Sequence, residues 1–134
     1  MTQNPDVDVL IVEDEKKLRF FASEVFRLEG ISAAAVADGC QAMQYFEGVV
    51  ARGGKLPRIV LLDLTMPCLS GYDVYKQIAA APWCAGVTVI ITSAAGDKFD
   101  NRNGPAQTLQ LTKPYEVTRL VDMLRKIAPE LFAA

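Results

Sequence analysis

The stretch IVLLDLTMP, residues 59–67, is a run of four strongly apolar residues that ends in an acid and is followed by a turn-forming segment. The apolar run is typical of a buried strand, and the residues after Asp63, with Gly71 soon following, indicate a turn at the strand's C-terminal end. Because burial of an uncompensated carboxylate is costly, we expect Asp63 at the mouth of a site rather than in the core. In an open parallel α/β sheet, ligands bind at the carboxyl ends of the strands.

Four more segments fit strands of the same sheet, at residues 7–12, 31–36, 87–92 and 108–112. Between them and after the last one, apolar residues recur at the spacing of one helix face. The predicted buried stripes are Leu18, Phe21, Ala22, Val25 and Phe26 in the first helix, Ala42, Met43, Phe46, Val49 and Val50 in the second, Val74 and Ile78 in the third, and Val117, Leu120, Val121, Leu124 and Ile127 in the last. Asp38 with Gln41 and Ser70 with Asp73 have the spacing of capping boxes that begin the second and third helices.

This alternation of strands and helices predicts an α/β fold with a mainly parallel sheet, right-handed crossovers and helices on both faces. Residues 96–105 are mostly turn-forming, so we expect one short helical turn or a long loop between the fourth and fifth strands. The sequence contains no internal repeat and no interdomain linker, and residues 1–134 therefore read as a single domain.

The composition is that of an ordinary soluble globular protein, with 51% hydrophobic and 22% charged residues. A net charge of −2 provides no bulk field that would favour nucleic acid or an anionic membrane. The N-terminus lacks the basic and apolar regions of a signal peptide, and no apolar stretch approaches the roughly 18 residues of a membrane span. The three cysteines, Cys40, Cys68 and Cys84, share no metal-ligand spacing, so we expect reduced thiols in a cytoplasmic protein.

Polar residues stand at four of the predicted strand ends. Glu13 and Asp14 follow the first strand, Asp63 ends the third, Ser93 follows the fourth and Lys113 follows the fifth. Each feature alone is commonplace, since acids after a strand are often helix caps. Their combination on successive strands of one predicted sheet indicates a shared site.

The chemistry of this set is specific. Crowded carboxylates either raise a pKa or hold a hard divalent cation, and Mg²⁺ prefers oxygen ligands and bridges to phosphate oxygens. Asp63 could then act as a nucleophile toward phosphorus and form an aspartyl phosphate. Lys113 would supply positive charge, and the Ser93 hydroxyl would supply a hydrogen-bond donor, for a reaction that depends mainly on positioning and charge neutralisation.

The sequence closely resembles the receiver domain of two-component response regulators. The residues that carry the resemblance are the acidic pair Glu13-Asp14, the segment 61–67 with Gly71, the fourth-strand exit 90–94, and Lys113-Pro114, and the likeness extends from about residue 7 to about residue 127. It implies a flavodoxin-like, doubly wound five-stranded parallel sheet of strand order 2-1-3-4-5.

The resemblance also implies roles for individual residues. Asp63 would accept a phosphoryl group from a histidine kinase or phosphotransfer protein, with Mg²⁺ bound by Glu13, Asp14, Asp63 and the Thr65 backbone carbonyl. Ser93 would be the switch hydroxyl, and Lys113 would pair with the phosphoryl group. The chain would be a signalling domain that assists its own phosphorylation and dephosphorylation, not an enzyme acting on other substrates.

Three features depart from the family, and the first two concern how phosphorylation is read out. Gln110 occupies the position three residues before the lysine where the family usually carries an aromatic residue. The region of the fourth helix, often part of the signalling face, is the turn-forming segment 96–105. Glu13 replaces the commoner aspartate with a longer carboxylate that should still serve the metal.

Nothing recognisable follows the last helix, at residues 128–134. The chain is expected to be either a single-domain regulator that docks to a protein partner or a receiver cut from a longer protein with an output domain; the start at Met1 favours the first for the N-terminus. No direct contact with nucleic acid or membrane is expected, and the protein should be a monomer or a weak, phosphorylation-dependent dimer.

Two other functions compete with phosphoryl acceptance. A receiver-like domain could bind partners without being phosphorylated, although the complete acidic set and Lys113 argue against it. A phosphatase of the haloacid-dehalogenase type would need a second aspartate two residues after the nucleophile, where this chain has Thr65. A P-loop is excluded because no Ser or Thr follows Lys55.

Overall fold

The structure, a computed structural model of the chain, describes residues 6–66, 68–83, 86–94 and 107–132. Strands and helices alternate along it, as the hydrophobic pattern predicts. The elements are β1 (Val9–Val12), α1 (Lys16–Leu28), β2 (Ala33–Val36), α2 (Gly39–Ala51), β3 (Ile59–Asp63), α3 (Gly71–Ala80), β4 (Thr88–Ala94), β5 (Gln107–Lys113) and α4 (Val117–Ile127), followed by a 3-10 turn at Pro129–Phe132.

The five strands form one parallel sheet of order β2-β1-β3-β4-β5. The predicted flavodoxin-like, doubly wound α/β fold and its strand order 2-1-3-4-5 are therefore confirmed. The short or irregular helix predicted between the fourth and fifth strands falls on residues 95–106, which lie outside the described residues. None of the described helices combines the length and the apolar character that crossing a bilayer requires.

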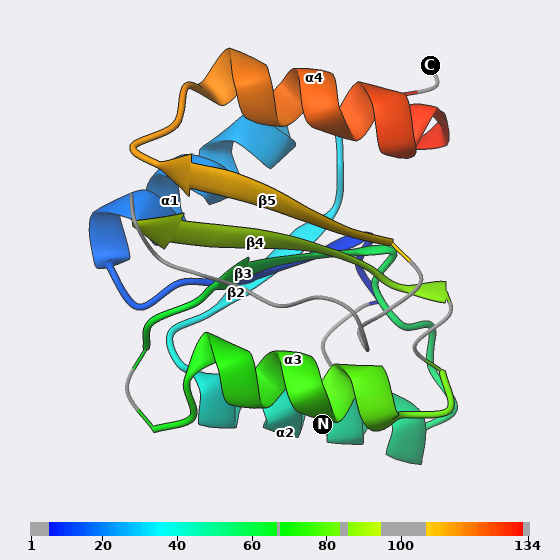
Figure 1. Cartoon of the computed structure of the whole chain (residues 1–134). Coiled ribbons are helices and arrows are strands. Elements are labelled where there is room, and N and C mark those ends of the chain that lie inside the picture. Colours follow the sequence, from blue (N-terminus) through cyan, green and yellow to red (C-terminus); the bar gives the residue numbers. More distant parts are fainter. Residues whose placement is uncertain (1–5, 67, 84–85, 95–106, 133–134) are drawn as a thin grey trace.

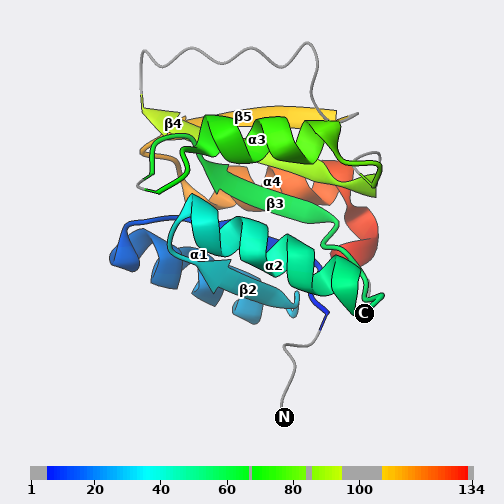
Figure 2. The same ribbon diagram turned by 90° about the horizontal axis from the view of Figure 1, so that it is seen from below.

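Helices cover both faces of the sheet, with α1 and α4 on one side and α2 and α3 on the other (Figures 1 and 2). Each face has its own apolar cluster, because side chains alternate between the two faces along a strand. Val9, Ile11, Leu61 and Ile90 lie in the α1/α4 cluster, and Leu10, Val60, Leu62 and Ile91 in the α2/α3 cluster. The central strands are thus buried on both faces, which explains their continuous apolar runs.

The last two strands extend further than the sequence pattern indicates. The ladder between β4 and β5 continues through Ser93, which is in register with Thr112, and Ala94, which is in register with Lys113. Ser93 and Lys113 therefore sit within the ends of their strands rather than after them. Backbone pairing sets these ends, and pairing continues past the point where the side chains stop being apolar.

The predicted capping residues are confirmed for both helices on the α2/α3 face. The Asp38 carboxylate accepts a hydrogen bond from the backbone N–H of Gln41 at 2.8 Å, and the Ser70 hydroxyl accepts one from that of Asp73 at 3.2 Å. The Gln41 side chain returns to the N–H of Ala37, one residue before the capping residue, at 2.9 Å. These contacts satisfy backbone donors that have no partner within the helix.

Two members of the predicted buried stripes are exposed instead. Phe21 in α1 is 48% exposed and Val50 in α2 is 52% exposed, whereas Ala22 and Phe26 are buried as predicted. The prediction was wrong for Phe21 and Val50 because helical spacing fixes which residues share a face, but not how wide a part of that face the sheet covers.

The expectation that the cysteines are reduced thiols is wrong for one pair. Cys40, in the first turn of α2, and Cys68, in the connection between β3 and α3, form a disulfide with their Cα atoms 5.9 Å apart. Their separation of 28 residues gives no hint of this, because the approach depends on how the connection packs on α2. Cys84 lies outside the described residues.

Gly71 holds the start of α3 close to the end of β3. Its N–H donates to the Leu64 carbonyl at 2.9 Å, and a Cβ at this position would overlap the carbonyl oxygen of Asp63 and the Cα of Leu64. We expect Gly71→Ala to lower the free energy of unfolding by about 2 kcal/mol, because both clashing atoms belong to backbone that must shift. Chemical denaturation measures this loss.

Gly48→Ala is the matched control, since Gly48 lies inside α2 and a Cβ there meets nothing within 4 Å. This variant should gain about 0.5–1 kcal/mol from the helix propensity of alanine. A Gly71→Ala protein as stable as wild type would show that the close approach of α3 to Asp63 is not required.

Candidate functional site

The predicted site residues gather at the edge of the sheet where the parallel strands end. Glu13 directly follows β1, Asp63 is the last residue of β3, and Lys113 is the last residue of β5. Ser93 lies one residue beyond Thr92, the register partner of Asp63. Glu13, Asp63 and Ser93 are buried, with 6%, 5% and 8% of their surface exposed.

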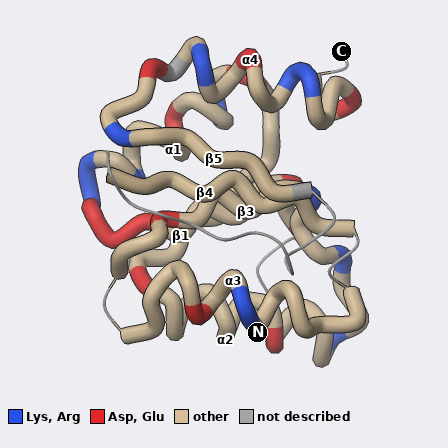
Figure 3. The backbone as a smooth tube through the Cα atoms, in the orientation of Figure 1, with Lys and Arg blue, Asp and Glu red and all other residues tan. Residues whose placement is uncertain are grey.

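Three carboxylates crowd together at this edge. Glu13, Asp14 and Asp63 each offer an oxygen within 4.8 Å of the others, and Asp14 is exposed while the other two are buried. Figure 3 shows the acidic positions between β1 and α1, followed by the basic start of α1. Glu13 and Asp63 are 50 residues apart in the sequence, so the sheet and not the local sequence brings them together.

Lys113 is a cation shared by two of these acids. Its Nζ lies 2.9 Å from Oε1 of Glu13 and 3.3 Å from Oδ2 of Asp63, and its side chain is 23% exposed. The contact with Glu13 is a hydrogen bond of good length, and the one with Asp63 is longer. Lys113 therefore bridges two buried carboxylates. It reaches them from β5, which is separated from β1 by β3 and β4.

The electrostatic environment of Asp63 disfavours its charged form. Burial is the largest cause and the nearby Glu13 carboxylate adds to it, so that the pKa of Asp63 rises from 3.8 to about 7 although Lys113 acts in the opposite direction. For Lys113, burial lowers the pKa of the ammonium, but its contacts with Glu13 and Asp63 outweigh burial and the net shift is upward. The positive charge of Lys113 is therefore too small to offset the burial of Asp63 and its repulsion from Glu13.

Backbone groups hold the acids in place. The Thr65 N–H lies 3.3 Å from Oδ1 of Asp63, and the Glu15 N–H donates to Oε2 of Glu13 at 3.1 Å. The Leu64 N–H donates to the Thr92 carbonyl at 2.9 Å, which ties the segment after Asp63 to β4. The predicted metal-binding carbonyl of Thr65 therefore belongs to a connection whose first two residues are anchored.

Sequence reasoning missed two residues around the site. The Arg19 guanidinium, from α1, donates to the carbonyls of Glu13 at 2.9 Å and of Asp14 at 3.3 Å, which fixes the acidic turn to the helix. Tyr115 lies close enough that Glu13 raises the pKa of its phenol, after the larger effect of burial. Its position two residues after Lys113 was a signal that could have found it.

Gln110 of β5 is not buried in the acidic cluster. It is exposed and lines a surface depression of about 430 Å³ together with Thr112, Pro114 and Tyr115. Tyr115 is aromatic and lines both this depression and the neighbouring one that includes Lys113.

The residues of the edge fit a hard divalent cation. All the side-chain ligands are carboxylate oxygens, and they lie within reach of one ion. Burial and the nearby Glu13 carboxylate raise the pKa of Asp63, and a bound cation would offset both effects. Oxygen-only coordination suits Mg²⁺, which commonly uses one or two carboxylates and keeps several waters. Cys40 and Cys68 also lie near an acid, Asp38, but their sulfurs are joined in the disulfide.

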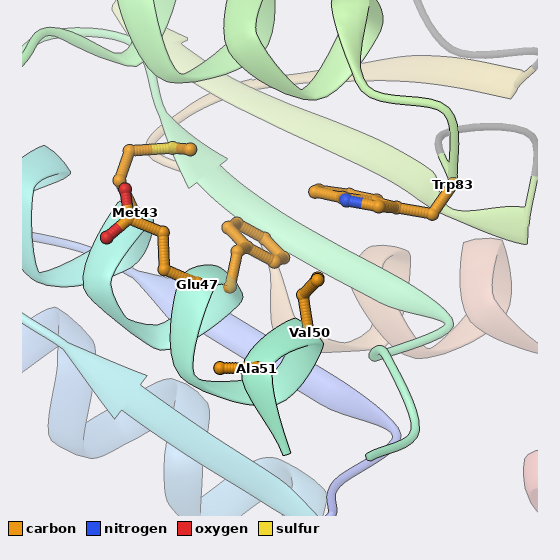
Figure 4. Close-up of a pocket in the computed structure, with 6 residues that line it drawn as sticks. Met43, Glu47, Val50, Ala51 and Trp83 are labelled. Carbon is orange, nitrogen blue, oxygen red and sulfur yellow. The ribbon is translucent and has the colours of Figure 1, made fainter. Parts of the chain in front are cut away.

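An apolar groove of about 310 Å³ lies away from this edge, between α2 and the residue Trp83 that follows α3 (Figure 4). Its lining is Met43, Phe46, Glu47, Val50, Ala51 and Trp83, with the rings of Phe46 and Trp83 stacked 5.2 Å apart. α3 begins beside Asp63 and runs back along the strands, so its last turn lies toward their amino ends and this groove is separate from the acidic cluster (Figure 1).

The parallel five-stranded sheet, with its acidic cluster and lysine at the carboxyl edge, defines a signalling domain of the two-component type. The chain belongs to the response regulator receiver domain family, whose pattern it matches over residues 9–125.

Two characterised proteins illustrate the likeness. The chain is 38% identical over 121 residues to the sensory transduction protein RegX3 of Mycolicibacterium smegmatis, covering 89% of this chain and 49% of that protein. It is 28% identical over 123 residues to sporulation initiation phosphotransferase F of Bacillus subtilis, covering 90% of this chain and 93% of that protein. The chain therefore spans about half the length of RegX3.

A solved structure with the same fold contains a metal ion. The receiver domain of a sensor histidine kinase from Pseudomonas aeruginosa superimposes with a TM-score of 0.69 at 25% identity, covering 90% of this chain and 96% of that one. That structure has a magnesium ion coordinated in its active-site cleft.

Proposed function

We propose that this receiver domain accepts a phosphoryl group on Asp63 from a phosphohistidine of a sensor histidine kinase or phosphotransfer protein. The observation that carries the proposal is the pairing of a buried, charge-deficient Asp63 with Lys113 inside a cluster of three carboxylates. Such a cluster gains positive charge from a divalent cation, and the cation together with Lys113 then neutralises the charge of an incoming phosphoryl group.

Magnesium would be held by Glu13, Asp14, Asp63 and the backbone carbonyl of Thr65. When bound, it supplies positive charge that offsets the repulsion among the carboxylates and the charge on the phosphoryl oxygens. The magnesium in the related histidine-kinase receiver and the all-oxygen ligand set of this chain support this assignment.

The residues of the chain have distinct roles in the transfer. An oxygen of Asp63 forms the bond to phosphorus while the bond from phosphorus to the donor's imidazole nitrogen breaks. Lys113, already 3.3 Å from Asp63, pairs with the phosphoryl oxygens, and the Ser93 hydroxyl donates a hydrogen bond to one of them. Asp63 phosphate is later hydrolysed at the same site, which returns the domain to its resting state.

The surface beside the site supports a protein as the phosphoryl donor. Phe20 is 67% exposed and Phe21 48% exposed on α1. Phe21 also lines a depression of about 340 Å³ together with Glu15, Leu18, Lys113, Pro114 and Tyr115. An apolar surface next to a reactive group is what a partner must cover to deliver its phosphohistidine.

We also propose a compartment, an oligomeric state and a kind of output for the domain. Residues 1–134 act as one receiver domain in the cytoplasm, as a monomer or a weak phosphorylation-dependent dimer. Phosphorylation changes affinity for a downstream protein target or output domain, without direct binding to nucleic acid. The match to half of RegX3 and to nearly all of phosphotransferase F supports either arrangement of the output.

Acetyl phosphate with Mg²⁺ tests the proposal without a partner. We expect the intact mass of the protein to increase by one phosphoryl group, and chelation of the metal to abolish this increase. Asp63→Asn should remain unmodified, because the amide cannot act as the nucleophile. Asp73→Asn is a matched control, since Asp73 is an exposed aspartate of the capping pair of α3, and it should be modified as wild type is.

The outcomes separate the competing functions. A wild-type protein that stays unmodified would favour a docking module that works without phosphorylation. Repeated turnover of a general phosphate ester that depends on Asp63 would favour a phosphatase instead.

A further inference from the structure

The connection between β3 and α3 is joined covalently to a second helix. Cys68 of this connection forms the disulfide with Cys40 of α2. Cys68 lies five residues after Asp63 and three after Thr65, the residue assigned to the metal. The disulfide therefore acts on the same short segment that shapes the phosphorylation site.

The segment from Leu64 to Ser70 is held at both of its ends by noncovalent contacts. Leu64 donates to the Thr92 carbonyl and accepts from the Gly71 N–H, both at 2.9 Å, and Ser70 caps α3. Just before Ser70, Leu69 packs so closely on α2 that a Cβ at Gly39 would overlap the Leu69 carbonyl. The disulfide adds a third and covalent anchor at Cys68, whose backbone is in the left-handed region with φ of 68°.

The pair is accessible to small molecules. Cys68 is exposed and Cys40 is half-buried in the first turn of α2. In reducing compartments disulfides are transient and are usually catalytic or redox-sensing. A disulfide on the surface beside a signalling site is in a position to open and close with the thiol balance of the cell.

We propose that Cys40 and Cys68 form a reversible redox pair that sets the affinity of the phosphorylation site for Mg²⁺, with the disulfide form binding the ion more tightly. The proposal rests on the function assigned to Asp63. Its cause is entropic: the disulfide restrains the segment that carries the Thr65 carbonyl, so less conformational freedom is lost when that carbonyl binds the ion.

The oxidation step uses a low-molecular-weight disulfide such as oxidised glutathione. The thiolate of Cys68 attacks one sulfur of that disulfide, and one glutathione leaves as its thiol. Cys40 then attacks the Cys68 sulfur of the mixed disulfide and releases the second glutathione. The two protein thiols thus lose two protons and two electrons, which the oxidised glutathione gains, and excess reduced glutathione reverses the step.

The test uses the full chain with Cys84→Ser, so that only the proposed pair of thiols remains. The protein is equilibrated with oxidised or with reduced glutathione and alkylated, and intact-mass spectrometry counts its free thiols. Calorimetric titration of each form then measures its affinity for Mg²⁺. We expect two thiols to disappear on oxidation and the affinity for Mg²⁺ to rise about tenfold, the factor that ordering about one backbone residue represents. The melting temperature should rise by roughly 10 °C.

The control variant carries Cys40→Ser in addition, which leaves Cys68 without its partner. Its affinity for Mg²⁺ should be the same in both buffers and should match that of the reduced parent. Failure to form the intramolecular disulfide, or an oxidised form that binds Mg²⁺ within twofold of the reduced form or more weakly, would overturn the redox inference.

The two proposals fail differently. If both redox forms bind Mg²⁺ equally and both accept phosphate from acetyl phosphate, the function of Asp63 stands and the redox control is refuted. If neither form binds Mg²⁺ or accepts phosphate, the assigned function fails and the redox control fails with it, whatever the thiol count.

Discussion

Replacement of Lys113 with methionine is expected to lower the free energy of unfolding by about 3 kcal/mol at about pH 8 in the presence of a chelator. Lys113 contacts two buried acids, Glu13 at 2.9 Å and Asp63 at 3.3 Å. Methionine keeps most of the length and packing of the side chain but removes the charge, so both carboxylates stay buried without their cation. Removal of one partner of a buried ion pair costs more than the pair itself contributes.

The loss should shrink as the solution becomes more acidic. The pKa of Asp63 is raised to about 7, so near pH 5 this side chain is largely protonated in the folded protein and needs less compensation. Chemical denaturation at both pH values measures the difference between the variants. Lys55→Met is the matched control, because Lys55 is 62% exposed and pairs with Asp8 at 3.4 Å.

The control should change stability by less than about 0.5 kcal/mol at either pH, as expected for an exposed ion pair. If Lys113→Met is no more harmful than Lys55→Met, then Lys113 does not compensate the buried carboxylates in solution.

Replacement of Asp63 with asparagine should have the opposite effect and stabilise the metal-free protein at about pH 8 by roughly 2–4 kcal/mol. The sign follows from the direction of the pKa shift. The pKa of Asp63 is higher in the folded state, at about 7, than its ordinary value of 3.8, because of burial and the neighbouring Glu13. Its protonated form therefore favours folding, and this contribution is fully present below the ordinary pKa and is lost as pH rises through the folded value.

Asparagine stays neutral and removes this dependence. Wild type should lose stability relative to Asp63→Asn between about pH 4 and pH 7, and the gap should level off above that range. Denaturation curves at a series of pH values with a chelator present measure the gap. Identical pH profiles of the two proteins would show that Asp63 does not titrate with a raised pKa.

Added Mg²⁺ provides an independent check on the same pair of proteins. A ligand that binds only the folded state stabilises it, so wild type should gain stability with increasing Mg²⁺. Asp63→Asn should gain much less, because it has lost a charged ligand. The ion would therefore reverse or close the gap that is seen in chelator.

Lys113→Met and Asp63→Asn remove the same ion pair and yet should change stability in opposite directions. The reason is that the edge carries three acids and one bridging lysine among the described residues, so positive charge is in deficit there. Loss of the lysine enlarges the deficit and loss of one acid reduces it. A site with this repulsion is stabilised by the divalent cation that we assign to it, and that cation also offsets the charge of a phosphoryl group added there.

Much of the candidate site was predictable because each part of it depends on a local signal. The apolar run before Asp63 marks a strand and the residues after it mark a turn. The same holds for the acids after β1 and for Lys113 at the end of β5. Parallel strands joined by right-handed crossovers must have their carboxyl ends at one edge, so local signals were enough to bring Glu13, Asp63, Ser93 and Lys113 together.

The limits of several elements were not predictable in the same way. The pattern ends β4 at residue 92, but the ladder with β5 extends it to Ala94. The exposure of Phe21 depends on how much of α1 the sheet covers. Both are set by the neighbouring element and not by the residues themselves.

The sequence by itself thus determined the order of the elements, the doubly wound parallel fold and the edge at which the acids and the lysine meet, because hydrophobic period and turn chemistry act over a few residues. Only the tertiary structure decided that Lys113 bridges Glu13 as well as Asp63, that Arg19 holds the acidic turn, and that Cys40 meets Cys68. These contacts join residues whose distance depends on the packing of helices against the sheet and on the path of each connection. Packing at that level is a property of the whole fold, and no local pattern encodes it.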